Sequence, residues 1–222
     1  MLQEYIIIVA GGTGKRIKGN IPKQFIEMNG KPLIVYTIEK FFAYNPEIQM
    51  CIVVHKDYLQ HMNDLIQKHF PDKNIKTTIG GEARFHSVKN GLALIENSNS
   101  VVGIHDAARP IVSVDTIKRC YETASQKGNA IPVVDVNESI RMIENNSNKA
   151  VNRSNYKVIQ TPQCFNTTLI KKAFEQEYSN LFTDDASVLE RMGEKIILVE
   201  GNTENIKITH DTDLILAQHF LK

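Results

Sequence analysis

Short apolar runs recur along this chain, and stretches with helical spacing lie between them. Residues 5–9 form a continuous run of apolar, mostly β-branched side chains, and a glycine-rich stretch follows. Such a run predicts a strand that is buried on both faces of a sheet. Similar runs predict further strands at residues 49–55, 76–79, 101–105, 130–134 and 195–199.

Amphipathic stretches separate the predicted strands. Pro32 suits the first turn of a helix in which Leu33, Tyr36, Thr37 and Phe41 share one face. Further helices are predicted at residues 57–69, 82–96, 114–126 and 211–221. Because alternating strands and helices need crossover connections, we predict a Rossmann-like α/β fold, with a mainly parallel sheet and helices on both faces.

One segment, residues 136–158, interrupts the alternation. It is polar, lacks a helical period and contains Asn145, Asn146 and Asn148. We predict that this segment leaves the body of the domain, either as a surface loop or as a hairpin arm that packs on a partner. The length of 222 residues fits one α/β domain with an added arm. We therefore predict a single domain over residues 1–222, with residues 136–158 inserted as the arm.

Composition limits which binding partners and which cellular compartment can be expected. The net charge is +1 and no basic block stands out, so no nucleic-acid partner is expected. No stretch approaches the roughly 18 apolar residues of a membrane span, and the first residues lack the cationic leader of a signal peptide. The three cysteines are widely spaced and form no C-x-x-C pair. We expect a reduced, cytoplasmic protein without a membrane partner.

The glycine-rich stretch after the first strand predicts a phosphate-binding loop. Small residues there let backbone amides converge on a phosphate at the carboxyl end of a strand. A Walker A loop is excluded because Val9 and Arg16 stand where glycine and Ser/Thr are needed, and Ile17 excludes a dinucleotide fingerprint. The alternative is a tight turn with solvated cations. Lys23, next to Pro22, favours phosphate chemistry as a second, fixed point charge.

Two more segments follow predicted strand ends. Residues 81–87 could read the edge of a pyrimidine through backbone groups and the Ser87 hydroxyl, or they could simply cap a helix. Asp106, at the end of another strand, is the kind of single carboxylate that Mg²⁺ prefers beside substrate oxygens. The alternative interpretation is that Asp106 has a structural role, as a capping aspartate that pairs with Arg109.

Seven blocks in the same order carry a resemblance to a known family. They are residues 10–16, 22–24, 80–88, 105–110, 161–163, 183–187 and 200–207. Together they resemble the 2-C-methyl-D-erythritol 4-phosphate cytidylyltransferases of the non-mevalonate isoprenoid pathway, over about residues 5 to 221. The resemblance implies a fold of the nucleotide-diphospho-sugar transferase type, a homodimer joined through the arm, and a divalent metal, Mg²⁺, as cofactor.

The resemblance also implies a nucleotide site for CTP. Arg16 and Lys23 would be catalytic, because they would stabilise charge on the α-phosphoryl group and the leaving oxygens. Asp106 would hold the metal. Many relatives carry aspartate where this chain has Glu82. The implied nucleotide-binding residues are Ala10, Gly11, Gly12, Thr13, Gly14, Lys15, Gly81, Glu82, Ser87 and Ala107.

The second substrate implied is a polyol phosphate. Its phosphate would meet Arg153, Thr161 and Lys207, with the region of Ser139 and Arg153 reaching into the neighbouring subunit's site. Ser139 keeps the hydroxyl of the threonine that is usual in relatives. The implied substrate-binding residues are Asp106, Arg109, Ser139, Arg153, Thr161 and Lys207.

The resemblance therefore implies that the chain transfers CMP from CTP to 2-C-methyl-D-erythritol 4-phosphate and releases pyrophosphate. The attacking phosphate oxygen is already ionised near neutral pH, so no general base is needed. Ribitol-5-phosphate cytidylyltransferase is the nearest alternative. A sugar-1-phosphate nucleotidyltransferase and a non-catalytic nucleotide-sensing module are further ones.

Overall fold

A central sheet organises the computed structural model, which describes residues 2–12 and 21–221. The strand order is β10-β7-β11-β6-β1-β4-β5, and β12 pairs with β7. Four neighbouring strands run parallel: β6 (Ser100–Asp106), β1 (Gln3–Ala10), β4 (Gln49–Val54) and β5 (Ile75–Ile79). The predicted α/β fold with a mainly parallel sheet is confirmed.

The other side of the sheet is mixed. β11 (Gln163–Asn166) runs antiparallel between β6 and β7 (Asn129–Asp135), and β10 (Lys157–Ile159) runs antiparallel at the edge. The sequence did not reveal β10 or β11. The strand expected at residues 195–199 is β12 (Leu198–Glu200), parallel to β7.

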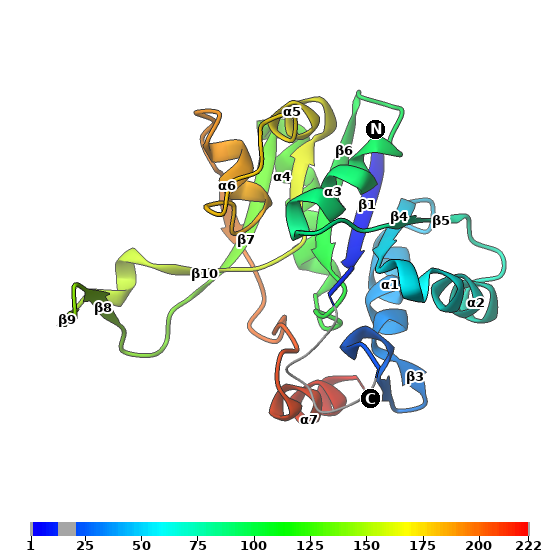
Figure 1. Ribbon diagram of the computed structural model, residues 1–222, viewed down its shortest axis with the longest axis horizontal. Helices are drawn as coiled ribbons and strands as arrows, with labels where there is room; N and C mark the ends of the chain where they lie inside the picture. The colour runs from blue at the N-terminus through cyan, green and yellow to red at the C-terminus, as the bar shows by residue number, and fades with distance from the viewer. Residues whose placement is uncertain (1, 13–20, 222) are drawn as a thin grey trace.

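Helices cover both faces of the sheet, as Figure 1 shows. Alternate side chains of β1 explain why: Ile6 and Ile8 belong to one buried cluster, and Ile7 belongs to another. The first cluster includes side chains of α1 (Leu33–Tyr44), α2 (Leu59–His69) and α4 (Val114–Lys127). The second includes side chains of α3 (Arg84–Ala93), α5 (Thr167–Ala173) and α6 (Asp185–Glu190).

Small elements gather at the end of the sheet toward which β1 points (Figure 1). A third buried cluster joins α7 (Asp211–Phe220) to α1 and to the hairpin of β2 (Glu27–Met28) and β3 (Lys31–Pro32). Pro32 precedes α1 as its N-cap and does not lie in the first turn. Short 3₁₀ turns occupy Lys23–Phe25, Lys56–Tyr58 and Arg153–Asn155. No helix in the described ranges has both the length and the apolarity needed to cross a membrane.

Residues 136–158 contain a second, separate hairpin. β8 (Arg141–Glu144) and β9 (Ser147–Ala150) pair antiparallel, and all eight residues are exposed. Asn145 and Asn146 adopt positive φ angles of 46° and 61°, which matches the tight turn that joins two-residue hairpins. The asparagines therefore mark a turn, and Figure 1 shows the hairpin projecting away from the sheet.

Candidate active site

A cleft of about 640 Å³ lies where β1 and β6 end. Since the two strands are parallel neighbours, the segments that follow them meet at one edge of the sheet. The sequence-predicted residues that line the cleft are Ala10, Gly11, Gly12, Lys23, Gly81, Glu82, Ser87, Asp106, Ala107 and Lys207. Thr13, Gly14, Lys15 and Arg16 lie outside the described residues.

The glycine stretch is tied to the 3₁₀ turn that carries Lys23. Gln24 is buried, and its side-chain amide donates to the Ala10 carbonyl at 2.7 Å and to the Gly12 carbonyl at 3.4 Å. The amide therefore fixes the start of the loop relative to the neighbouring lysine. Gln24 belongs to the block at residues 22–24, but no role was predicted for it. Its position next to Lys23 was the only indication in the sequence that it is functional.

Lys23 connects the loop side of the cleft to the segment before α7. Its Nζ donates to the Ile208 carbonyl at 2.8 Å, and the Ile208 N–H donates to the Ala108 carbonyl at 2.9 Å. Lys23 and Lys207 therefore face the same cleft, although 184 positions separate them in the sequence. Two ammonium groups at the mouth of a glycine-lined cleft suit a polyanionic ligand.

Residues 80–87 form the opposite wall, and their glycines are required by close packing. The Ser87 hydroxyl accepts from the Gly81 N–H at 3.1 Å and donates to the Ala83 carbonyl at 3.2 Å. A Cβ at Gly80 would lie 2.8 Å from the Ser87 Oγ, and one at Gly81 would lie 2.4 Å from the His86 Cβ. The helix begins at Arg84, two residues later than predicted, so residues 81–83 lie outside the helix and line the cleft.

Asp106 is the shared anion of three cations. Lys207 Nζ lies 2.8 Å from its Oδ2, Arg109 Nε lies 3.6 Å from the same oxygen, and Arg84 Nε lies 3.4 Å from its Oδ1. Burial by itself raises the pKa of this carboxyl, but the charges of Arg84, Lys207 and Arg109 outweigh burial and hold the pKa far below its ordinary value. Asp106 is therefore charged at any physiological pH.

Thr161 supports Asp106 from behind the cleft. Its Oγ accepts from the Asp106 N–H at 3.1 Å and lies 3.0 Å from the His105 Nδ1. The His105 Nε2 lies 3.0 Å from the Arg109 carbonyl, which can only accept, so Nε2 carries the ring proton and Nδ1 accepts from Thr161. The one proton of the Thr161 hydroxyl is thus committed to His105. Within this chain, Thr161 orients the Asp106 segment and has no proton left for a phosphate.

His105 makes the stability of this region depend on pH. Burial lowers the pKa of His105 to about 4, from an ordinary 6.5. Between about pH 6.5 and 4, the His105 ring is protonated in the unfolded chain but stays neutral in the folded one. The free energy of unfolding therefore decreases as the pH falls through this range, by at most about 3 kcal/mol. Chemical denaturation of the wild type and of His105→Asn across this range should show a stability difference that shrinks as pH falls. A difference that stays constant from pH 7 to 4 contradicts this assignment.

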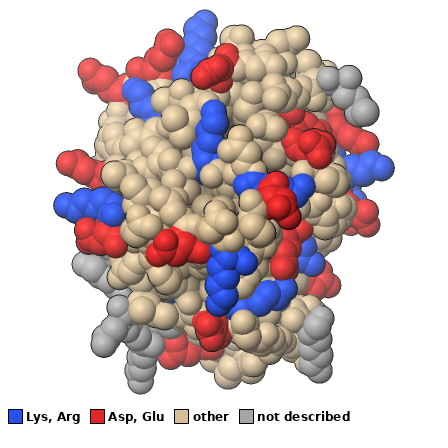
Figure 2. Space-filling model, turned by 90° about the vertical axis from the view of Figure 1, so that its right-hand side faces the viewer, with Lys and Arg blue, Asp and Glu red and all other residues tan. Residues whose placement is uncertain are grey.

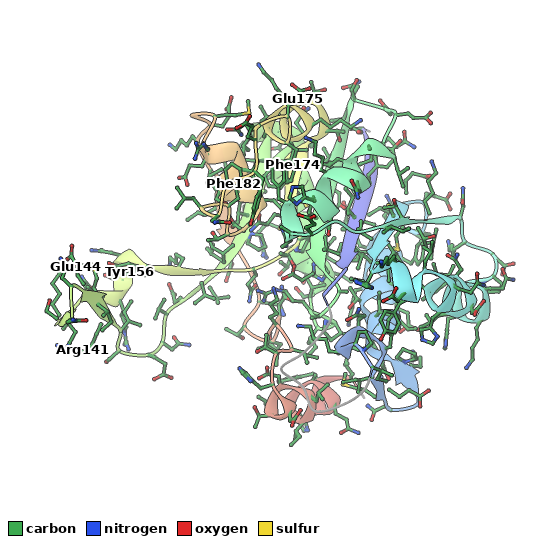
Figure 3. All side chains as sticks on the ribbon, in the orientation of Figure 1. Arg141, Glu144, Tyr156, Phe174, Glu175 and Phe182 are labelled. Atoms are coloured by element: carbon green, nitrogen blue, oxygen red, sulfur yellow. The ribbon has the colours of Figure 1, made fainter. Side chains whose placement is uncertain are left out.

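Four predicted residues with described positions do not line the cleft of their own chain: Arg109 and Thr161, which contact Asp106, and Ser139 and Arg153. Ser139 and Arg153 are both exposed, in the segment that contains the β8–β9 hairpin. The Arg153 guanidinium donates to the Asn137 carbonyl within that segment. Figure 3 labels Arg141, Glu144 and Tyr156 of the same segment, which lies well apart from the sheet. Among the described residues, one isolated chain therefore forms the cleft without Ser139 and Arg153.

The cleft can offer a metal ion only a partial set of ligands. Among the described residues, no group of three or more His, Cys, Asp or Glu side chains is placed to hold a metal. Mg²⁺ in nucleotide sites commonly takes one or two carboxylates and completes its shell with phosphate oxygens and water. The charged Asp106 carboxylate at the cleft wall fits one such ligand, and Lys207 at present occupies one of its oxygens.

Two charged residues of the site were missed by the sequence analysis as functional candidates. Arg84 lines the cleft, and its NH1 donates to the Asp185 Oδ1 at 2.6 Å. Asp185 is buried at the start of α6. Both belong to predicted blocks, but nothing in the sequence links positions that are 101 residues apart.

Comparisons with known proteins agree with this geometry. The 2-C-methyl-D-erythritol 4-phosphate cytidylyltransferase family profile matches residues 5–222. The enzyme of that name from Bacteroides fragilis is 46% identical over 97% of this chain and 98% of its own length. The one from Phocaeicola vulgatus is 44% identical over 98% and 99%.

Solved structures give the same result. The 4-diphosphocytidyl-2C-methyl-D-erythritol synthase from Anaerococcus prevotii superposes with a TM-score of 0.85 at 27% identity, covering 99% of this chain and 96% of that one. The Francisella tularensis 2-C-methyl-D-erythritol 4-phosphate cytidylyltransferase has a TM-score of 0.80 at 35% identity, covering 98% and 99%. By sequence and by structure, this chain belongs to the family of 2-C-methyl-D-erythritol 4-phosphate cytidylyltransferases.

Proposed function

We propose that the cleft binds CTP and catalyses transfer of its CMP group to 2-C-methyl-D-erythritol 4-phosphate. The products are 4-diphosphocytidyl-2-C-methyl-D-erythritol and pyrophosphate, in keeping with the family. One observation carries the assignment of the site: Lys23, Lys207 and Arg84 converge on a single cleft beside a glycine stretch. A cleft of this charge, at the carboxyl ends of parallel strands, suits a nucleoside triphosphate.

The nucleotide would lie along the two glycine segments. Residues 10–15 would surround the triphosphate with backbone amides, and residues 81–87 would meet the cytosine. Glu82 and Ser87 supply polar side chains there, and the small Ala107 lets the ligand approach the chain closely.

Catalysis would rest on charge and alignment. A phosphate oxygen of the polyol phosphate attacks the α-phosphorus of CTP, and the bond to the pyrophosphate oxygen breaks in line with it. Arg16 and Lys23 would stabilise the negative charge that develops on the α-phosphoryl group and the leaving group. His105 is buried behind the cleft with both ring nitrogens engaged, which agrees with a reaction that needs no general base.

A metal would add to this stabilisation. Asp106, together with triphosphate oxygens, would hold Mg²⁺, and the bound ion would neutralise phosphate charge and orient the triphosphate.

The second substrate would be held by residues of two subunits. Lys207 and Arg109 lie beside Asp106 in one chain, with Thr161 orienting the segment behind them. Ser139 and Arg153 would come from the projecting segment of the other subunit in a homodimer. The outward position of this segment and its full exposure at β8 and β9 support that arrangement. We therefore keep residues 1–222 as one domain with residues 136–158 as its dimerisation arm.

Mixing two inactive variants tests the shared site. Lys23→Ala and Arg153→Ala should each be nearly inactive as homodimers. If Arg153 serves the partner's cleft, a heterodimer of the two variants contains one intact site of two. Random re-association of an equal mixture after mild dissociation makes about half of the dimers heterodimers, so activity should rise to about a quarter of that of the wild type. Should the mixture remain as inactive as its parents while heterodimers are present by mass spectrometry, Arg153 does not act across the interface.

We also infer the cellular location of the enzyme and the kind of partner that its surface suits. All three cysteines are free and buried, which supports a reducing, cytoplasmic location. Cationic and anionic side chains are interspersed on the face shown in Figure 2, in keeping with small anionic substrates rather than a nucleic acid or a membrane surface.

A pyrophosphate-release assay tests the proposed function directly. The four common nucleoside triphosphates are each paired with 2-C-methyl-D-erythritol 4-phosphate and with ribitol 5-phosphate, in the presence of Mg²⁺. We expect turnover with CTP and the methylerythritol phosphate to exceed every other pair by at least about 100-fold. Preferential use of ribitol 5-phosphate, or binding of CTP without pyrophosphate release, would overturn the proposal.

A further inference from the structure

An ion pair joins Arg84, at the cleft wall, to the buried Asp185, and Asp185 has no place in the proposed mechanism. Asp185 is 1% exposed, and one of its oxygens accepts from Arg84 at 2.6 Å. Its other oxygen, Oδ2, is buried without a hydrogen-bond partner among the described residues. A buried carboxylate with an unsatisfied oxygen is costly, and an apolar pair of similar size would often be more stable. Stability alone therefore does not account for this pair.

Asp185 is also not needed to start its helix. The preceding residue, Asp184, caps α6 by accepting from the Ser187 N–H at 2.9 Å, and the Ser187 hydroxyl completes a capping box. The Gln163 side chain fastens the same turn by donating to Asp184 and accepting from the Ala186 N–H. Capping is thus complete without Asp185, so its carboxylate is available to Arg84.

Arg84 is held from two sides at the wall of the cleft. Its Nε faces the Asp106 Oδ1 at 3.4 Å, and its NH1 faces Asp185. The adjacent ring of Phe85 stacks on Phe174 at 4.7 Å and on Phe182 at 5.5 Å between ring centroids, which anchors the start of α3 against the end of α5 and the loop before α6. Figure 3 labels Phe174 and Phe182 in this region. Backbone and side chain are therefore both fixed where Arg84 meets Asp106.

The four groups form a row of alternating charge. Asp185 contacts Arg84, Arg84 contacts Asp106, and Asp106 contacts Lys207. If the Asp185 charge is removed, Asp106 becomes the remaining carboxylate in contact with Arg84 among the described residues. Asp106 would then move toward Arg84 and away from Lys207, because one carboxylate cannot hold both cations as closely.

We propose that Asp185 is a positioning residue that acts through Arg84 to place Asp106 and Lys207 for the transfer reaction. The inference rests on the proposed function, because it assumes that Asp106 and Lys207 serve the reacting groups. Neither Asp185 nor Arg84 needs to touch the reacting atoms. A shift of about 1 Å in a group that aligns a substrate can reduce the rate by as much as about 100-fold.

A double-mutant cycle on kcat/KM tests the proposal. The variants are Asp185→Asn, Arg84→Met and the combination of both, assayed by pyrophosphate release from CTP. Each single variant should lose about 10- to 100-fold in kcat/KM. The double variant should be no worse than the poorer single one, because both changes break the same connection. Losses that multiply, or an Asp185→Asn enzyme within twofold of the wild type, would overturn the proposal.

Two further variants separate positioning from folding. Asp184→Ala removes the cap of the same helix without touching Arg84, so it should lower the unfolding midpoint and leave kcat/KM within about twofold of the wild type. Asp185→Glu retains the charge and should recover most of the activity lost in Asp185→Asn, which also covers the case in which the asparagine variant folds poorly. Equal losses of kcat/KM in Asp184→Ala and Asp185→Asn would contradict the proposal. A wild-type enzyme that releases no pyrophosphate would instead refute the proposed function.

Discussion

Replacing Lys23 with alanine should lower kcat by about 100- to 1,000-fold while changing the KM for CTP by less than about fivefold. Lys23 lies in the cleft, and its Nζ is directed toward the Ile208 carbonyl beside Lys207. We place its main effect in the transition state, where charge grows on the α-phosphoryl group and on the departing pyrophosphate. An interaction that strengthens only then appears in kcat and hardly at all in ground-state binding.

Steady-state kinetics with CTP varied at saturating polyol phosphate give both constants for Lys23→Ala. Lys68→Ala is a matched control because Lys68 is exposed on α2, outside the cleft, and its loss should leave both constants unchanged. If Lys23→Ala raises only the KM for CTP and keeps the wild-type kcat, Lys23 binds the nucleotide without stabilising the transition state.

Replacing Asp106 with asparagine should weaken both the fold and the activity. Three cations, Arg84, Arg109 and Lys207, share this one carboxylate. Without this carboxylate, Arg109 and Lys207 lose their ion-pair partner while Arg84 keeps Asp185, so we expect the free energy of unfolding to fall by about 3 kcal/mol. Activity should fall by at least about 100-fold, because the same cations would no longer be held in place.

Ligand rescue distinguishes this explanation from a general packing defect. Pyrophosphate supplies the negative charge that Asp106→Asn lacks, so it should stabilise the variant more than it stabilises the wild type. Urea denaturation with and without pyrophosphate measures both effects. A variant with wild-type stability, or one that pyrophosphate does not stabilise, would show that the three cations do not depend on Asp106.

The sequence was most informative where a pattern is long and regular. The run at residues 5–9 and the amphipathic stretch at 114–126 correspond to β1 and α4 within one or two residues at each end. β11 was missed because its four residues include Gln163 and Asn166 and form no apolar run; its burial comes from its place between β6 and β7. α5 and α6 have seven and six residues, too few for a helical period to be recognised.

The candidate site was predictable where its residues directly follow strands. Gly11 and Gly12 follow β1, and Asp106 ends its parallel neighbour β6, so their meeting follows from topology. Partnerships between distant residues could not be predicted in this way. The contact of Arg84 with Asp185 depends on how α3 and α6 pack on one face of the sheet, which no local pattern encodes.

A crystal structure of the enzyme with CTP and Mg²⁺ is the most direct test of the nucleotide site. The account predicts cytosine against Gly81 and Ser87, with the phosphates beside Gly11, Gly12 and Lys23. Electron density for CTP on another surface, with the ends of β1 and β6 left free, would contradict it.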